Sequence, residues 1–441
     1  MNSEITKAIE HEISELVQQA LNGALDFETL EGLVRETSLR TAAAVLERMI
    51  NSAGDDSSAA ITRADDGTVL TYVGKRTKTF VTVLGEITLH RAYYTDGNGR
   101  GYFPQDRNLG FDTDCLSGGV KRMIGHTAGV LSFTESSLMI RNLAGLHVGS
   151  KHVERAGEAL GQEIINTEKS QVVQVPPCST TMYLGMDGTG CPMRKEETEG
   201  RTGKQPDGSA KTREVKLAVV FSADSRDSHG KPTRDVGSVS YNAAIESAAT
   251  ADVDESLSEF AQRTERETQR RGFDKAALQV VIGDGAKWIW NIADEQFPDA
   301  IQIIDLFHAK GTISTAAKAI FGTENKFGAQ WAKTCRDELE AGKLERIIEK
   351  LKAFAENCKE ARQCREYLIT NRRRLNYPRF RALGLCTSSG IVESGCKHVI
   401  GARVKQSGMH WTVRGANAII ALRCFKLSGR FDAFMDQRRS A

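Results

Sequence analysis

Two aspartates stand out because each follows an apolar run and precedes a glycine. Asp187 ends the segment YLGMD and Asp284 ends the segment VVIGD. The carboxyl ends of neighbouring strands in an α/β sheet meet at one edge, where ligands usually bind. Two acids there would offer the oxygen ligands that Mg²⁺ prefers. The alternative is that each Asp-Gly pair is simply a turn. Three other pairs are expected to be turns: Asp66-Gly67, Asp96-Gly97 and Asp207-Gly208.

Glu393 is a third candidate because it is an acid within a basic tract. From Ala361 to Ala441 there are sixteen Lys and Arg against four acids, a net charge of +12 in a chain whose total is +2, so the remainder carries −10. Segregated basic charge indicates a polyanionic partner, although a solvated basic face is the common alternative. Two-metal phosphoryl transfer needs about three carboxylates to hold the cations, and Glu393 could complete such a set.

Composition limits the class of protein. The 441 residues are 40% hydrophobic and 26% charged, as in a soluble globular protein, and a chain of this length holds about two to four domains. There is no apolar run of membrane-spanning length, and the polar start does not resemble a signal peptide, so we expect a cytoplasmic protein associated with the nucleoid. The nine cysteines form no CxxC pair, which argues against a zinc ribbon or a disulfide framework.

The apolar spacing predicts two small modules at the N-terminal end. Residues 1–50 have apolar positions at helical spacing, which predicts a helical arm for packing or dimerisation. Residues 65–112 contain two alternating segments on either side of Gly85, which predicts a β-hairpin module.

Residues 113–170 are predicted to be helical and to bind DNA. Leu138, Ile140 and Leu143 mark one helix that ends at Ala144-Gly145, and Ser150 can cap a second helix. Two helices around a tight turn form the outline of a helix-turn-helix. Many ordinary helical hairpins have the same outline, so the pattern leaves both interpretations open.

Residues 178–441 predict a mixed α/β domain. Three strand-like segments come first, a helical stretch follows at about 243–271, and two more strands each lead into a helix. Residues 325–375 are charged and helix-prone, which indicates a helical insertion before the basic tract. The result is a mixed sheet covered by helices.

Several segments together resemble the DDE transposases of bacterial insertion sequences, specifically the ISKra-four group, which is related to mutator-like transposases. The resemblance extends from about Phe80 to Phe434 and is carried by these segments: LGMDGTGCPMR, VVIGDGAKWIW, IIDLFHAK, LSGRFDAF and, most specifically, the block from YLITNRRR to GANAIIALR. It implies an RNase H-like catalytic domain with a helical insertion, and a catalytic and metal-binding triad of Asp187, Asp284 and Glu393.

The resemblance also implies roles for other residues. Asp305 and His308 match a D-x-x-H element and are expected to be accessory, although a core histidine is nearly as good an interpretation of His308. Trp411 would stack on DNA, with core packing as the alternative. The residues expected to bind DNA are Arg372, Arg373, Arg374, Lys397, Arg403, Lys405, His410 and Trp411.

The predicted function is therefore DNA transposition. The protein would bind the terminal inverted repeats of its element and use two Mg²⁺ or Mn²⁺ ions to cleave and transfer strands, with transposon ends and target DNA as double-stranded partners. Synapsis of two ends indicates a dimer or a higher homo-oligomer. The alternatives are a structure-specific nuclease or resolvase of the same fold, and a domesticated, catalytically silent DNA-binding regulator.

Overall fold

A computed structural model describes residues 26–53, 60–64, 66–111, 114–170, 179–249, 257–388 and 390–440, with residues 7, 10, 11, 13–15, 17, 18 and 22. The chain divides into two compact units, of which one is Met1–Gly157 with Asp432–Ala441 and the other is Glu158–Phe431. Within the described ranges, no helix combines the length and the apolar character needed to cross a membrane.

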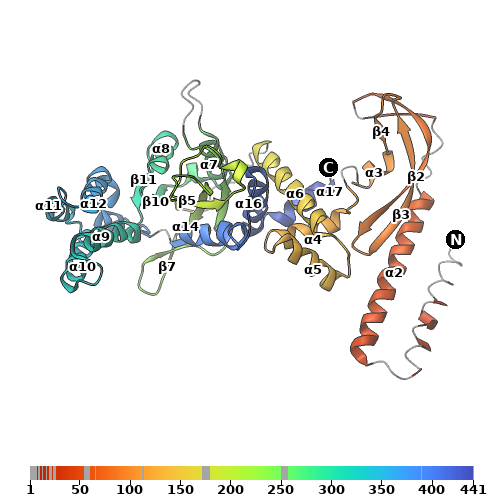
Figure 1. Cartoon of the computed structure of the whole chain (residues 1–441), viewed down its shortest axis with the longest axis horizontal. Helices are drawn as coiled ribbons and strands as arrows, with labels where there is room; N and C mark the ends of the chain where they lie inside the picture. Colours follow the sequence, from red (N-terminus) through yellow and green to blue (C-terminus); the bar gives the residue numbers. More distant parts are fainter. Residues whose placement is uncertain are drawn as a thin grey trace. The chain divides into compact units, whose positions relative to one another are not determined.

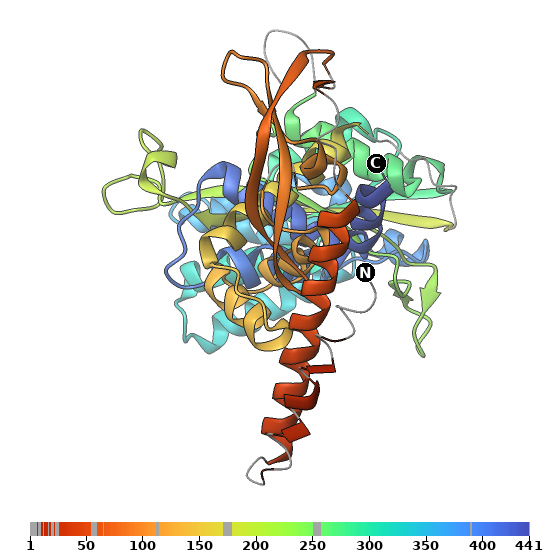
Figure 2. The ribbon, with the colours of Figure 1, turned by 90° about the vertical axis from the view of Figure 1, so that its right-hand side faces the viewer.

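The first unit contains an antiparallel sheet with a long helix beside it (Figure 2). The backbone N–H groups of Thr88 and His90 donate to Glu47 and Asn51 of the helix, at 2.6 and 2.9 Å. Because an open strand edge exposes unpaired N–H groups, these contacts cover the edge of the third strand. The elements, in sheet order β1-β2-β3-β4, are α2 (Phe27–Ala53), β1 (Ile61–Arg63), β2 (Val69–Thr82), β3 (Gly85–Thr95) and β4 (Gly101–Tyr102).

The structure confirms the predicted pair of strands around Gly85. This glycine has a φ of 133°, in the region that other residues avoid, and it follows the turn between β2 and β3. The helix α2 agrees with the second half of the predicted helical arm, whereas most of residues 1–25 lie outside the described part.

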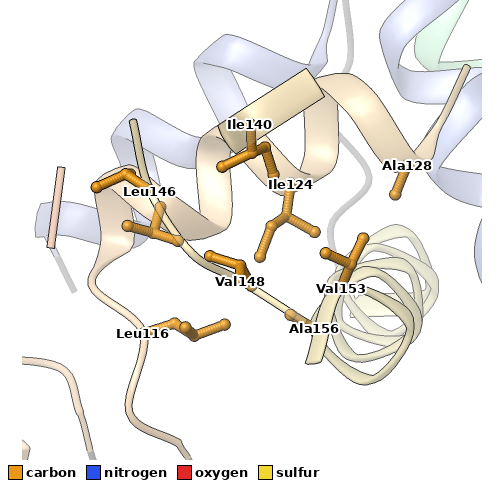
Figure 3. Packing of buried hydrophobic residues seen from close by; sticks show 9 residues of the cluster. Leu116, Ile124, Ala128, Ile140, Leu146, Val148, Val153 and Ala156 are labelled. Carbon is orange, nitrogen blue, oxygen red and sulfur yellow. The ribbon is translucent and has the colours of Figure 1, made fainter. Parts of the chain in front are cut away.

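Two helices of the first unit, with the start of a third, surround a small apolar core (Figure 3). Ser132 and Glu135 form a capping box at the start of the second helix, and Gly145 ends it in the left-handed conformation. The predicted helices and turn are confirmed, but Leu138 and Leu143 are exposed and only Ile140 of the three expected positions is buried. The helices are α4 (Gly118–Ala128), α5 (Phe133–Ala144) and α6 (Ser150–Ser170).

The second unit is built on a five-stranded mixed sheet, as predicted. The first three strands pair antiparallel, and the last two are added in parallel on the other side of the first. In sheet order β11-β10-β5-β6-β9, the strands are β5 (Thr181–Pro192), β6 (Thr212–Ser222), β9 (Ser240–Ala244), β10 (Leu278–Gly283) and β11 (Ile301–Ile304).

One predicted strand boundary was wrong. Asp187 does not end its strand, because β5 continues to Pro192 and pairs with β6 along this extension, from Asp187 with Leu217 to Pro192 with Thr212. The extension begins with Gly188-Thr189-Gly190, which has little strand propensity, so the ladder with β6 overrides the local preference.

Helices pack around this sheet, and the predicted helical segment at 325–375 is helical. Figure 1 shows α9 to α12 gathered beyond the side of the sheet formed by β10 and β11. The helices are α7 (Glu259–Arg271), α8 (Lys287–Gln296), α9 (Leu306–Phe321), α10 (Lys326–Glu340), α11 (Leu344–Lys352), α12 (Lys359–Thr370), α13 (Tyr377–Ala382), α14 (Gly390–Gly395), α15 (Ala402–Val404) and α16 (Val413–Leu427).

Candidate active site

The sheet register places Asp187 and Asp284 side by side. Ile282 of β10 pairs in parallel with Gly185 of β5, and two further residues along each chain lead to Asp284 and Asp187. Neighbouring strands are about 4.8 Å apart. Asp187, on β5, and Asp284, directly after the end of β10, are 97 positions apart in sequence and follow the last paired residues of the two strands by the same number of positions.

Asp187 lies in an environment that disfavours its negative charge. The pKa of its carboxyl group is raised above the usual value, mainly by burial and further by the nearby charge of Asp284. Two donors oppose this rise: the backbone N–H of Gly188, 2.7 Å from Oδ1, and the thiol of Cys396. A half-buried carboxylate beside a second acid is the kind of position that a cation would stabilise.

Asp284 lies in a turn that a helix from the segment 325–375 holds in place. Its Oδ1 accepts the N–H of Ala286 at 2.8 Å, so the Asp-Gly pair is a turn as well as a candidate site. The hydroxyl of Tyr367, on α12, donates to the carbonyl oxygen of Asp284 at 3.1 Å. Gly285 has a φ of 109°, and a Cβ there would collide with the ring of Tyr367. The turn therefore needs a glycine for both conformation and space.

Glu393 lies on a helix that packs directly on the same sheet. A Cβ at Gly185 would overlap Cγ2 of Val392, and a Cβ at Gly395 would be 2.9 Å from Cδ2 of Leu217. The backbone of α14 can approach the sheet this closely because Gly185 and Gly395 have no side chain. This contact places Glu393 above β5 and β6.

The side chain of Glu393 faces solvent. It is 61% exposed and pairs with Lys397 one helical turn later, with 2.8 Å between Nζ and Oε1. The Lys397 ammonium, by its hydrogen bond and its charge, lowers the pKa of Glu393, and His308 adds a smaller effect. Within the described ranges, no three Asp, Glu, His or Cys side chains are close enough to hold one metal ion.

A cavity of about 980 Å³ is lined by two of the three acids but not by Asp284. Asp187 and Glu393 both line it, together with Asp305 and His308. Asp305 is buried, and its Oδ1 accepts the N–H of His308 at 2.9 Å, so it caps the start of α9. In the D-x-x-H element, the three-residue spacing is therefore that of a helix cap. His308 is exposed, so a ligand in the cavity could reach its side chain.

Two of the residues expected to bind DNA are buried, which contradicts that expectation. Trp411 is 5% exposed, and its indole N–H donates to the carbonyl oxygen of Val404 at 2.9 Å. The guanidinium group of Arg403 is fully buried and lies 5.2 Å from the centre of the Trp411 ring. Core packing, the alternative for Trp411, is what the structure shows.

The three adjacent arginines do not lie at the cavity of the acids. Arg372, Arg373 and Arg374 line a different cavity of about 730 Å³ with Ile301 and Gln302, at the start of β11. Asp305 follows the other end of that strand. Arg374 is half-buried and stacks on Trp290 at 4.5 Å, whereas Arg373 is exposed and Arg372 is exposed but paired with a glutamate.

Three predicted DNA-binding residues are exposed, and two of them, Lys405 and His410, lie near the extension of β5. Lys397 pairs with Glu393, the amine of Lys405 donates to the hydroxyl of Thr189, and Nδ1 of His410 is 3.4 Å from the carbonyl oxygen of Met193. These side chains, unlike Arg403 and Trp411, are accessible to a polyanion.

Sequence comparison places the chain in a family. The model of an uncharacterised protein family, UPF0236, matches residues 20–435. The chain belongs to this family. No curated protein matches the UPF0236 chain. A solved structure, described as the Drosophila P element transposase strand transfer complex, is similar with a TM-score of 0.26 and 11% identity, over 75% of this chain and 83% of that one. A likeness this low supports no argument about function.

Two site residues of this UPF0236 protein were not anticipated from the sequence. Cys396 lowers the pKa of Asp187, and the hydroxyl of Tyr367 donates to the carbonyl oxygen of Asp284. A signal for Cys396 existed, because it follows Glu393 by three residues and so lies one helical turn away. Nothing local in the sequence connects Tyr367 to an aspartate that precedes it by 83 residues.

Proposed function

We propose that this chain is a DDE transposase of the ISKra-four type, with an RNase H-like catalytic domain over residues 178–441. The proposed reaction is hydrolysis of a phosphodiester at the element end, followed by attack of the freed 3′-hydroxyl on target DNA. The observation that carries the proposal is the register of β5 and β10, which aligns Asp187 with Asp284 next to the helix that bears Glu393.

The strand arrangement supports the RNase H-like assignment. Three antiparallel strands, with two parallel strands added beside the first, match the order expected of that fold. Asp187 on the first strand and Asp284 after the fourth strand of the sheet are then the first two acids of the motif, and Glu393 on a later helix is the third.

Asp187 and Asp284 suit a divalent cation. Burial and mutual repulsion raise the pKa of Asp187, and a cation would relieve both effects. A bound Mg²⁺ or Mn²⁺ would polarise the phosphodiester and activate water. Glu393 fits less completely, because its carboxylate is engaged by Lys397. An exposed pair of this kind is weak, so a phosphate group that takes over Lys397 would release the carboxylate.

The three-helix core of the first unit suits recognition of the element ends. Val153 and Ala156 of α6 face that core (Figure 3). Lys151, His152 and Arg155 are exposed, and the first and last of these are one helical turn apart. A cationic face at the N-terminal end of the second helix of a helix-turn-helix is the part that enters the major groove.

A binding and cleavage assay with Glu393→Gln tests the proposal. DNA that carries the terminal repeats of the element should bind the variant and the wild type with similar affinity, since the change keeps the shape of the side chain. Mg²⁺-dependent cleavage should be lost in the variant alone. Glu366→Gln is the matched control, because Glu366 is an exposed acid of the same tract that does not line the cavity. Wild-type cleavage by Glu393→Gln would remove Glu393 from the mechanism.

The same assay separates the two alternatives. A catalytically silent regulator would bind the ends without Mg²⁺-dependent cleavage, and the pairing of Glu393 with Lys397 is the observation that favours it. A structure-specific nuclease would cleave branched DNA without preference for the terminal repeats. Association of two protomers on paired ends, measured by light scattering, would test the proposed oligomer.

A further inference from the structure

The cavity of the acids includes a cleft between two helices, α9 and α12. These helices pack against each other (Figure 1). One wall is formed by Phe307, Gly311 and Thr315 of α9, and the other includes Gln363 and Tyr367 of α12. On each helix these residues are about one turn apart, so they lie on one face. The cleft therefore runs along both helices.

The charge of the lining makes most of the cleft a poor place for phosphate groups. Four acids line the cavity, namely Asp187, Asp305, Glu360 and Glu393, and no lysine or arginine is among the described residues that line it. Like charges repel, and they do so most strongly where water is partly excluded. A divalent cation could admit one phosphate group at the acids. The rest of the cleft suits an uncharged group.

Phe307 gives the cleft a flat apolar surface. Its side chain lies in the first turn of α9, is 67% exposed and lines the cavity. Gly311, one turn further along, has no atom within 4 Å of the place of a Cβ, so the helix face next to Phe307 is open. The amine of Lys310 is 6.0 Å from the centre of the Phe307 ring, at the outer limit of a cation–π contact, and it pairs with Glu340. The ring is therefore available to a ligand in the cavity.

The backbone that carries Phe307 is tied to the end of the sheet where the acids lie. The N–H of Asp305 donates to the carbonyl oxygen of Gly283 at 2.8 Å, and the N–H of Leu306 donates to that of Thr387 at 3.0 Å. Gly283 directly precedes Asp284. Because two consecutive N–H groups are bound to other segments, the start of α9 is held in place beside the sheet.

Phe327 shows what an exposed phenylalanine looks like outside this setting. It is also 67% exposed, and it also lies in the first turn of a helix, α10. Its ring packs edge-on against Phe321, with 5.3 Å between the ring centres, and it does not line the cavity. Exposed apolar side chains are common on soluble proteins. Exposure alone therefore does not distinguish Phe307, whereas its place in the cavity does.

We propose that the cleft between α9 and α12 binds an unpaired nucleobase of the DNA strand at the acids, and that this base stacks on Phe307. Every base has a flat face that stacks on an aromatic ring, and its edge can bond to the amide of Gln363 or the hydroxyl of Thr315. Bases in a duplex are already stacked on one another, so the cleft takes a base that is extruded or single-stranded. This role rests on the proposed function, because DNA is the substrate in both.

Binding of two single-stranded oligonucleotides to the full chain in Mg²⁺, measured by fluorescence anisotropy, tests the base site. One is an oligodeoxythymidylate, and the other is an abasic oligomer of the same length, which keeps the phosphates and lacks the bases. Wild type should prefer the thymidylate by about 5- to 150-fold, the value of one stacked base. Phe307→Ala and Phe307→Leu should lose this preference, whereas Phe307→Tyr keeps a ring and should retain it. Phe327→Ala is the matched control and should behave as wild type does.

The outcomes separate the base site from the proposed function. An unchanged preference in Phe307→Ala, or no preference in wild type, would overturn the base site alone. Equal losses in Phe307→Tyr and Phe307→Ala would also overturn it, because a stacking ring would then not be what the base requires. If wild type kept the preference but did not cleave DNA with the terminal repeats in Mg²⁺, the proposed reaction would be overturned and the base site would stand. Thermal unfolding of each variant verifies that it is folded.

Discussion

The acids borne by the sheet and the acid borne by the helix differ in how they are held. Asp187 lies on β5 and Asp284 directly follows β10, and each is held by a hydrogen bond: the N–H of Gly188 donates to the Asp187 carboxylate, and the Tyr367 hydroxyl donates to the carbonyl oxygen of Asp284. Glu393 has one ion pair, with an exposed lysine on its own helix. The candidate site thus has two positions that the backbone determines and one that a rotatable side chain determines.

The backbone of α14, unlike the side chain of Glu393, is firmly packed on the sheet. Val392 and Gly395, on either side of Glu393, pack against the sheet as closely as neighbouring core residues do. A change of the Glu393 rotamer could therefore bring the carboxylate toward the cavity without any movement of α14. The strands and the backbone of α14 are therefore packed in place, whereas the carboxylate of Glu393 is exposed on a rotatable side chain.

We expect the largest effect from a substitution of Asp284, and this effect should distinguish the two aspartates of the sheet from Glu393 on the helix. Asp284→Asn should lower Mg²⁺-dependent cleavage by at least about a thousandfold, since several kcal/mol of transition-state stabilisation depend on the metal. It should also weaken Mn²⁺ binding without DNA, whereas Glu393→Gln should leave that binding nearly unchanged. Calorimetry and a cleavage assay measure the two quantities.

Asp207→Asn is the matched control for Asp284→Asn. Asp207 also precedes a glycine, and its Oδ1 accepts the N–H of Ser209 at 3.0 Å, but it lies in the loop between β5 and β6 and does not follow a strand beside Asp187. If Asp284→Asn and Glu393→Gln weakened Mn²⁺ binding equally, the distinction between sheet-borne and helix-borne acids would be lost.

A smaller effect is expected from a change that touches none of the three acids. A Cβ in Gly185→Ala would overlap Cγ2 of Val392, and a valine has little freedom to rotate away. Overpacking of this kind costs about 1–3 kcal/mol of the free energy of unfolding. Cleavage should fall as well, because α14 must shift on the sheet. Urea denaturation measures the stability.

A second substitution can test whether Gly185 acts through that contact. Val392→Ala removes the atoms that the new Cβ would meet, so the double variant should be more stable than Gly185→Ala alone. Gly32→Ala, at a helix position with open space around it, should not destabilise the protein. A double variant less stable than Gly185→Ala would show that α14 does not depend on this contact.

The smallest effect is expected from removal of the ion pair. Lys397 lowers the pKa of Glu393, so this pair stabilises the fold above the unfolded pKa of the glutamate and is lost as the pH falls through the lowered value. In Lys397→Met, the pKa of Glu393 should rise toward its ordinary value, as NMR titration of the carboxyl carbon would detect. Thermal stability should change little, because both side chains are mostly exposed.

A similar ion pair elsewhere provides the control for Lys397. Lys333 and Asp337 are also four residues apart, at 2.9 Å, and both are 62% exposed. Lys333→Met should change thermal stability as little as Lys397→Met does. Only Lys397→Met should reduce the slope of log affinity against log salt for DNA, by about one. An unchanged slope would mean that Lys397 meets no phosphate.

Local patterns were enough to predict most elements. The apolar runs before Asp187 and Asp284 are strands, and the segment at 325–375 is helical. The pairs Asp66-Gly67, Asp96-Gly97 and Asp207-Gly208 are turns with a left-handed glycine, as expected. These features depend on residues within a few positions of one another, so their signals remain visible in a single sequence.

Local patterns failed where distant segments decide the outcome. Trp411 and Arg403 belong to a basic tract that predicts contact with DNA, yet the loop before α16 packs them against each other in the interior. Arg372 to Arg374 belong to the same tract, and they lie at the far end of β11 from the acids. Charge in a sequence shows how many basic residues are present, but burial and strand direction decide which of them reach a ligand.

The sequence by itself determined the chemical types available: two aspartates after apolar strands, one glutamate among basic residues, and the helices and strands that carry them. Only the tertiary structure decided which of these groups meet. Pairing between β5 and β10 aligned Asp187 with Asp284, and the fit of Val392 over Gly185 set α14 on the sheet. Such contacts join residues about 100 to 200 positions apart, and their energy depends on complementary shape and register, which a local pattern of residue types does not contain.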